Sequence, residues 1–463
     1  MFALCVYLVF CEVIFLYETL TKVSPLTELQ ILLWPGQMLC SGHAVIKKET
    51  MTDIELMKTK LTKLFIEFFE SEKTSGIILL CCTIISIIIA NSFLGREYLD
   101  FWQTKVGFET SAVNLKFTVE HWINDGLMAI FFLLIGLEIE RELFIGELCD
   151  LKNAILPIFA AIGGLSAPAL LHFLFNQGTE TQAGIAIPMA TDIAFALGVL
   201  SLLGNIVPVS LKIFLTALAI VDDLGAIAII ALFYVSEFSL FYLMLALGIF
   251  AGLFLLNRLG VQRLPFYLIP GIIMWYFMLK SGIHATIAGI LLAFVIPFGN
   301  GDKSPSYELQ HFLHKPVAFI IMPLFALANT AISLTGTWME GLTTSNSLGI
   351  FAGLFVGKPM GIILFSFIAI KIGLSRLPNG LSWKHIVGAG FLGGIGFTMS
   401  IFITILAFSN PEIVQSSKIC ILLSSLLAGT VGFIILRRKT AESVGATKIA
   451  YPVVSADART LRR

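Results

Sequence analysis

The stretch Leu215-Thr-Ala-Leu-Ala-Ile-Val-Asp-Asp-Leu-Gly-Ala-Ile-Ala-Ile-Ile230 is almost wholly apolar, yet it holds two adjacent aspartates, Asp222 and Asp223. It lies inside an apolar run, residues 209–235, that is longer than the roughly 20 residues needed to cross a bilayer. A charged side chain at the centre of a membrane helix costs about 2.5–3.5 kcal/mol on insertion scales, so its presence predicts a function. The stretch therefore indicates a membrane protein with a polar site inside it.

The rest of the chain has the same apolar character. Of its 463 residues 57% are hydrophobic and only 13% are charged, whereas soluble domains carry about 25% charged residues. Lys+Arg and Asp+Glu number 30 each, so the net charge gives no indication of nucleic-acid binding. The seven cysteines form no CxxC pair and have no histidine at metal-ligand spacing. We therefore expect no disulfide framework, no zinc site and no cofactor.

Hydropathy, read against breaks at glycine, proline and charged residues, predicts an all-α polytopic membrane protein with twelve transmembrane helices. They are expected at residues 76–93, 122–143, 154–175, 184–203, 209–235, 240–256, 265–279, 284–297, 312–333, 348–372, 386–408 and 417–436.

Lysine and arginine indicate the orientation, because they collect in short cytoplasmic loops. The loops at 176–182, 236–239, 335–347 and 409–414 contain neither residue. The alternate loops and the end of the last helix contain Arg141, Lys152, Arg258, Arg263, Lys303, Lys315, Lys371, Arg376, Lys384, Arg437, Arg438 and Lys439. We predict a multi-pass protein of the bacterial inner membrane, with both termini cytoplasmic if the chain starts near Met57.

The first outer loop, residues 95–121, differs from the other outer loops because it holds Arg96, Lys105 and Lys116. Within it, residues 106–117 place β-branched and aromatic side chains around a small polar centre, which favours a short β-hairpin. Because an isolated hairpin is marginal in water, pairing with a second copy would stabilise it and make a homodimer. A plain ordered loop is the alternative.

The two ends of the chain differ from the part between them. The apolar run at residues 1–17 has no basic segment before it and contains Glu12, so it is a poor signal peptide. Residues 57–63 form a basic amphipathic segment, and we expect translation to start at Met51 or Met57. A thirteenth membrane segment is the alternative. The predicted organisation is an N-terminal extension at 1–56, a transmembrane domain at 57–438 and a disordered cytoplasmic tail at 439–463.

Two further segments carry charged or irregular sequence at membrane depth. Asp192 follows Pro188 and Thr191, which predicts a broken helix lining a cavity, since irregular backbone in a bilayer survives only there. A simple proline kink is the alternative. Glycines crowd residues 388–400, among them Gly393, Gly394 and Gly396. Close helix packing or a second broken helix would explain them, and two interrupted helices indicate a transport site at the midplane.

The charged groups suggest a competition between ions. Asp222 and Asp223 point about 100° apart on a helix, so one can face an ion cavity while the other faces a neighbouring helix. A carboxylate there can be protonated or can bind Na+, which prefers oxygen ligands, but not both. Lys358, also mid-helix, would be a counter-ion or a second proton carrier. The alternative for the two aspartates is a structural pair satisfied by a buried base.

Weaker candidates for pH sensing lie nearer the ends of the helices. Asp125 and Glu138 belong to a charged group that also suits interfacial salt bridges. His284 stands at a helix start, where capping or packing is the alternative. His311 and His314 lie at the inner mouth of the ninth helix, and histidine titrates near neutrality. Solvated loop histidines are the alternative there.

Seven motifs in order make residues 57–438 resemble the NhaA-type Na+/H+ antiporter family. They are Trp-Ile-Asn-Asp-Gly-Leu-Met-Ala-Ile-Phe-Phe (122–132), Gly-Leu-Glu-Ile-Glu-Arg-Glu-Leu (136–143), Ala-Thr-Asp-Ile-Ala-Phe-Ala (190–196), Val-Asp-Asp-Leu-Gly (221–225), Lys-Ser-Gly-Ile-His-Ala-Thr (280–286), Gly-Lys-Pro-Met-Gly (357–361) and Gly-Ile-Gly-Phe-Thr-Met-Ser-Ile-Phe (394–402).

The resemblance implies an architecture and a set of roles. The architecture is a twelve-helix fold with inverted three-helix repeats, helices three to five and ten to twelve, and two crossing discontinuous helices, the fourth and the eleventh. Asp192 and Lys358 would offset the dipole ends of the broken helices. Asp222 and Asp223 would bind Na+ and protons, with Asp222 pairing with Lys358 when the site is closed.

The resemblance also implies the activity. Cytoplasmic Na+ or Li+ would be exchanged for a larger number of external protons, so transport would be electrogenic. Activation at alkaline pH and a dimer through the first outer loop are implied as well. Gln310 departs from the pattern, because the family usually has a glutamate beside the first histidine of the pH-sensing cluster.

Three other functions fit the sequence less well. A sodium-coupled symporter of a small organic solute would need a larger polar cavity than the few polar residues provide. An intramembrane aspartyl protease needs two aspartates on different helices, typically one in a Gly-x-Gly-Asp context, so we expect no enzyme. A membrane sensor would gain nothing from adjacent buried carboxylates.

Overall fold

The computed structural model describes residues 74–110, 114–146, 149, 151–234, 238–299, 304–334 and 338–447. The expectations for residues 1–56, for a start at Met51 or Met57, and for residues 448–463 lie outside this range. The elements, in chain order after an unlabelled helix Thr74–Ala90, are α4 (Gly95–Gln103), β1 (Lys105–Val106), β2 (Phe117–Thr118), α5 (Val119–His121), η2 (Trp122–Leu127), α6 (Met128–Phe144), α7 (Leu151–Asn176), η3 (Glu180–Met189), α8 (Ile193–Leu202), η4 (Gly204–Ile206), α9 (Val209–Phe233), α10 (Leu240–Arg258), α11 (Pro265–Lys280), α12 (Ile287–Ala293), α13 (Pro305–Pro316), η5 (Val317–Ile321), α14 (Met322–Asn329), α15 (Trp338–Gly341), α16 (Ser345–Phe351), η6 (Ala352–Gly357), α17 (Lys358–Lys371), α18 (Trp383–Gly393), α19 (Phe397–Ala407) and α20 (Pro411–Thr447).

The protein is a multi-pass helical membrane protein, as the composition predicted. Seven helices of the described part are long and apolar enough to cross a bilayer, and up to ten spans result if each bent pair counts as one. The two predicted spans that fall short are α11, with 16 residues, and α12, with 7 residues. At 1.5 Å per residue these helices are about 24 Å and about 10 Å long, against about 30 Å of hydrocarbon. The count of twelve stays a prediction.

Two of the spans are broken, as the sequence predicted. The axes of η3 and α8 differ by 41°, and those of α18 and α19 differ by 43°. The first break, at residues 190–192, follows Pro188, and the second, at residues 394–396, lies in the glycine-rich segment. The two breaks meet: the Asp192 amide donates to the Ile395 carbonyl at 2.7 Å, and the Ser400 hydroxyl donates to the Ile187 carbonyl at 2.7 Å.

Glycine permits the closest helix crossing. A Cβ atom at Gly163 of α7 would lie 2.2 Å from the Gly361 carbonyl oxygen, and one at Gly361 of α17 would lie 2.0 Å from that of Gly163. Only glycine at both positions allows this approach. The crossing holds α17, with Lys358 at its first residue, against α7.

The helices pack as two bundles. The site bundle contains α7, η3, α8, α9, α16, η6, α17, α18, α19 and α20, whose members contact one another most. The flanking bundle contains α5, η2, α6, α10, α11, α12, α13, η5 and α14. Contacts of α6 with α9 and of α14 with α19 join the two. The site bundle corresponds to predicted helices three to five and ten to twelve, while their inverted symmetry stays a prediction.

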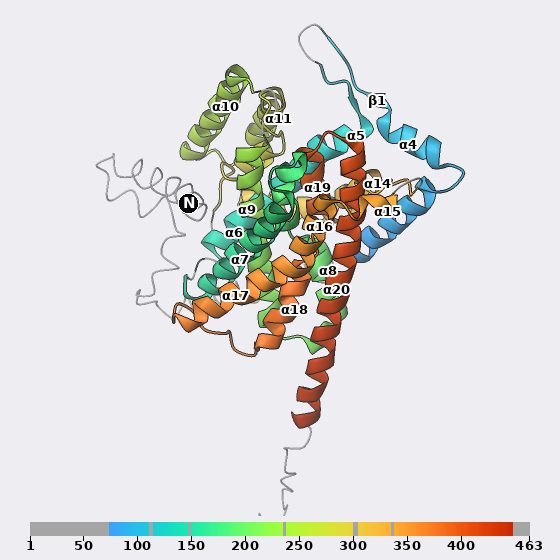
Figure 1. Ribbon diagram of the computed structural model, residues 1–463. Helices are drawn as coiled ribbons and strands as arrows, with labels where there is room; N and C mark the ends of the chain where they lie inside the picture. The colour runs from blue at the N-terminus through green and yellow to red at the C-terminus, as the bar shows by residue number, and fades with distance from the viewer. Residues whose placement is uncertain are drawn as a thin grey trace, which may run out of the picture.

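The predicted β-hairpin is present in the first outer loop. Strands β1 and β2 pair antiparallel, with Lys105 opposite Thr118 and Val106 opposite Phe117. The hairpin projects beyond the helices at the end opposite the last turns of α20 (Figure 1). We call the hairpin end the outer end, following the predicted orientation. Dimerisation through the hairpin stays a prediction.

Three local features differ from expectation. Helix α4, bent by 113° from Thr74–Ala90, occupies a part of the outer loop where no helix was predicted. Helix α20 continues to Thr447, past the predicted tail boundary at residue 439. Cys149 is disulfide-bonded, which the sequence did not predict, whereas Cys81, Cys82 and Cys420 are free.

Candidate functional site

The aspartate pair lies in the middle of α9, surrounded by protein. The exposed fraction is 0% for Asp222 and 1% for Asp223. Because α9 is a continuous helix, the two adjacent side chains point in different directions. They therefore have different neighbours, and each carboxylate is described in turn.

Asp222 faces a buried base. Its Oδ2 atom lies 2.8 Å from Lys358 Nζ, and both side chains are completely buried. The Thr191 hydroxyl donates to the same oxygen at 2.8 Å. Lys358 also donates to the carbonyl of Met189, the last residue of η3. The ammonium thus neutralises one aspartate and offsets the negative end of a broken helix at the same time.

Asp223 has no such partner. Among the described residues, neither its Oδ1 atom nor Oδ1 of Asp222 has a hydrogen-bond partner, although both atoms are buried. Asp223 interacts electrostatically with Asp222, Lys358, Asp192 and Glu138. Buried carboxylate oxygens are normally hydrogen-bonded, so two unpartnered ones in adjacent residues indicate a place for a proton or a cation.

Asp192 caps two helices at once. Its Oδ1 atom accepts from the Phe195 amide at 2.9 Å, at the start of α8. Its Oδ2 atom accepts from the Thr398 amide at 3.1 Å and from the Thr398 hydroxyl, at the start of α19. One carboxylate therefore satisfies free amides at both helix N-termini and offsets both positive dipole ends.

The glycine-rich break between α18 and α19 also contacts the site. Gly393 ends α18, and its carbonyl accepts a hydrogen bond from the Thr191 hydroxyl at 2.9 Å. A Cβ atom at Gly394 would lie 2.5 Å from the Leu354 carbonyl oxygen, so only glycine fits there. Gly396 is the residue before α19. The predicted glycines thus lie at the break and beside Thr191.

Replacing Asp192 by alanine is expected to lower stability, because both helix starts lose their cap. A lost cap costs about 1 kcal/mol, so the two together cost about 2 kcal/mol. Asparagine keeps one acceptor oxygen and can still accept one of the two backbone hydrogen bonds, so this substitution is expected to be milder. Thermal unfolding of the purified variants in detergent measures the difference. Equal midpoints for Asp192→Ala and wild type would contradict the double cap.

The residues predicted for pH sensing do not form one cluster. Glu138 of α6 and Gln310 of α13 are buried and hydrogen-bonded to each other, and Glu138 also interacts with Arg141. His314 lies near the same arginine and near the exposed His311. Those residues do gather at the inner end of α6.

Two other predicted residues lie elsewhere. Asp125 is in η2 near the outer end, and its Oδ2 atom lies 3.1 Å from His121 Nε2. His284 is hydrogen-bonded to the backbone of Tyr234. The structure thus separates them from the inner group around Glu138.

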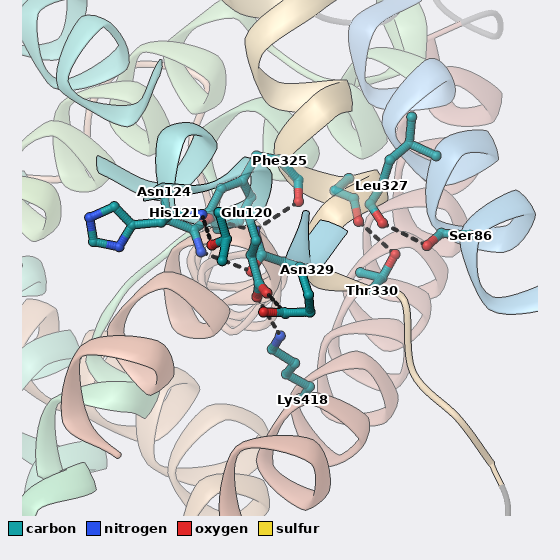
Figure 2. A network of polar contacts seen from close by, with 12 residues as sticks. Ser86, Glu120, His121, Asn124, Phe325, Leu327, Asn329, Thr330 and Lys418 are labelled. Atoms are coloured by element: carbon teal, nitrogen blue, oxygen red, sulfur yellow. Dashed lines mark hydrogen bonds and ion pairs between the residues drawn. The ribbon is translucent and has the colours of Figure 1, made fainter. Parts of the chain in front are cut away.

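Sequence reasoning missed two polar groups on the helices of the site bundle. His172 of α7 is completely buried, and its Nε2 atom lies 3.3 Å from Asn346 Oδ1. Lys418 of α20 faces Glu120 (Figure 2). His172 lies in an apolar run, so the criterion that found Asp222 would have found it, whereas Lys418 follows the polar stretch Gln415-Ser416-Ser417 at the start of its span.

The chemistry of the site suits a small monovalent cation and a proton. The described residues contain no group of three or more His, Cys, Asp or Glu side chains that could hold a metal ion. A sodium ion between the two aspartates would therefore complete its shell with backbone carbonyls, hydroxyls or water. Such a shell binds and releases its ion more readily than a dedicated cage of carboxylates.

Residues 66–436 match the sequence profile of a family described as Na+/H+ antiporter 1. The chain is 60% identical over 382 residues to the Na(+)/H(+) antiporter NhaA of Dechloromonas aromatica, covering 81% of this chain and 96% of that protein. It is 59% identical over 379 residues to that of Flavobacterium psychrophilum, with 82% and 97% covered. It is 50% identical over 374 residues to that of Aliivibrio salmonicida, with 80% and 96% covered.

Proposed function

Since the chain belongs to the Na+/H+ antiporter 1 family, we propose that it exchanges cytoplasmic Na+ or Li+ for external H+ across the bacterial inner membrane, by competition at Asp222 and Asp223. The observation that carries this proposal is the pair of adjacent buried carboxylates with an unpartnered oxygen on each. The other charged groups at the site, Asp192 and Lys358, support the broken helices around it.

The proposed cycle follows from the different neighbours of the two acids. Asp223 is either protonated or holds the cation, because a bare carboxylate is costly in this dry place. Asp222 is held by Lys358 when the site is empty of Na+, and an arriving cation competes with that ammonium for Oδ2. Binding of Na+ thus displaces the proton of Asp223, and the Lys358 ammonium that loses its partner gives up a second proton, both to the side from which Na+ came. On the other side two protons return to these groups and release Na+.

Sodium-dependent proton release is the direct test of this function. Purified protein in liposomes loaded with a pH-sensitive dye is expected to move protons when Na+ or Li+ is added, with K+ as the ionic control. A lack of response to Na+ at every pH would contradict the function. Uptake of a labelled organic solute with Na+ would instead favour the symporter, which neither the names of the relatives nor the composition of the site supports.

We also propose that the exchange is electrogenic, with one net charge moved per cycle. A potential of about 100 mV is worth about 2.3 kcal/mol for one charge, or about 50-fold in the Na+ gradient reached at equilibrium. Imposing a K+ diffusion potential with valinomycin on the liposomes is expected to change that gradient accordingly. A Na+ gradient that does not change with the potential would mean that one proton is exchanged for each sodium ion.

Regulation by pH is proposed for the inner end of α6. Glu138, Gln310, Arg141 and His314 are close to one another there, and Glu138 interacts with Asp223. A change of charge in this group would therefore change the potential at the ion site. Gln310 cannot titrate, so the alkaline response would depend on Glu138 and the histidines.

A further inference from the structure

A second polar network lies at the outer end, away from the aspartates. Figure 2 shows Glu120 and Asn124 near the start of the second span, together with Asn329 of α14 and Lys418 of α20. Lys418 belongs to the site bundle, and the other three belong to the flanking bundle. The network therefore contains contacts within one bundle and a contact between the two.

The contact between bundles is an ion pair. Glu120 Oε1 lies 4.0 Å from Lys418 Nζ, and the two side chains are 23% and 12% exposed. The other oxygen of Glu120 accepts a hydrogen bond from Gln103 of α4 at 2.6 Å, which orients the carboxylate. One turn before Lys418, the Gln415 side chain donates to the Ser333 carbonyl, just after α14. Helix α20 thus reaches the flanking bundle by two neighbouring polar contacts.

The anchor on the flanking side is rigid. Asn124 follows Glu120 by one helical turn and forms a reciprocal amide pair with Asn329, at 2.7 Å and 3.4 Å. Asn329 also donates to the Phe325 carbonyl at 3.0 Å. Both asparagines are buried and belong to the flanking bundle, so this pair joins the second span to α14 independently of the position of the site bundle.

We propose that Glu120 and Lys418, with Gln415 and Ser333, form an outer latch that favours the state in which the ion site is closed to the outside. This rests on the proposed function, because an antiporter with one site must open it to each side in turn. Opening the outer side requires the two bundles to part at this end, and the latch contacts must then break. The Asn124–Asn329 pair does not have to break.

The latch biases the two states rather than locking them. The charges are 4.0 Å apart and partly exposed, which places the pair among the weaker ion pairs. We expect its loss to shift the equilibrium between inward- and outward-open states by about fivefold. If binding follows the populations of the two states, the ratio of the apparent KM for Na+ on the inner side to that on the outer side changes by the same factor.

The test uses Glu120→Gln, which can still bind Gln103, and Lys418→Met, which keeps the length of the side chain. The apparent KM for Na+ is measured in everted and in right-side-out membrane vesicles from the same cells. Each variant is expected to raise the KM at the cytoplasmic face and to lower it at the outer face, so that the ratio rises about fivefold. The double exchange Glu120→Lys with Lys418→Glu is expected to return the ratio toward wild type.

Asn124→Ala is the matched control, because it breaks a polar pair within one bundle. It is expected to lower thermal stability and leave the KM ratio unchanged. If Glu120→Gln and Lys418→Met behave like this control, the latch is refuted and the ion pair is structural. A wild-type protein that shows no Na+-dependent proton movement in either vesicle would instead refute the proposed antiport.

Discussion

Asp223→Asn is expected to abolish Na+-driven proton movement without unfolding the protein. The amide has the size of the carboxylic acid but can neither take up a proton nor bind a cation as a charged ligand. Asp223 Oδ1 has no hydrogen-bond partner in the described part of the chain, so the substitution removes little from the folded state. It also removes a charge that is costly to bury. We therefore expect thermal stability equal to or above that of wild type.

Dye-loaded proteoliposomes measure the activity, and unfolding in detergent measures the stability. Asp223→Glu is the matched control, since it keeps the charge and is expected to keep part of the transport. A wild-type signal from Asp223→Asn would reject Asp223 as a site residue. Full activity after both Asp222 and Asp223 become asparagine would reject the whole mechanism.

Lys358→Met is expected to cause the largest loss of stability among single changes at the site. The side chains of Lys358 and Asp222 are completely buried and form one ion pair at 2.8 Å. Breaking a buried pair from one side costs about 3–5 kcal/mol, because the remaining charge loses its partner. The Met189 carbonyl loses its donor as well. An acid without its cationic partner stays protonated over a wider pH range, so the activity profile should move to higher pH.

The double variant Asp222→Asn with Lys358→Met separates the loss of stability caused by an unpaired buried charge from the loss of transport caused by removing site residues. It removes both charges and is expected to recover much of the stability while transport stays low. Lys371→Met, at the exposed end of α17, is the control for loss of a lysine as such. If Lys358→Met unfolds at the wild-type temperature and keeps the wild-type pH profile, its ammonium must face water.

The sequence predicted the parts of this site that break a local rule. Asp222, Asp223 and Lys358 stand out because charge is rare at membrane depth, and the structure places all three in one buried site. Pro188 and the glycines at 393–396 stand out because they interrupt helices, and both breaks are present. In each case a residue that is energetically unfavourable in a membrane helix indicates a part of the site.

Most pairings between distant segments could not be predicted from the residues alone. Only the family resemblance named Asp222 as the partner of Lys358, since neighbouring helix positions are equivalent until the other helices are in place. The partner of Asp192 is Thr398, 206 residues away. The short helices α11 and α12 have the apolar character of spans but not the length, so the count of twelve stays a prediction.

The double cap at Asp192 has a consequence for biogenesis. The N-terminus of α8 leaves the ribosome long before Thr398, its partner across the break. Until the tenth and eleventh predicted spans are inserted, the half-made protein holds acidic groups in lipid without Lys358 and Thr398, respectively, to satisfy them. We expect the fourth and fifth segments to remain loosely inserted during translation, and truncation before residue 398 to yield a chain that the cell degrades.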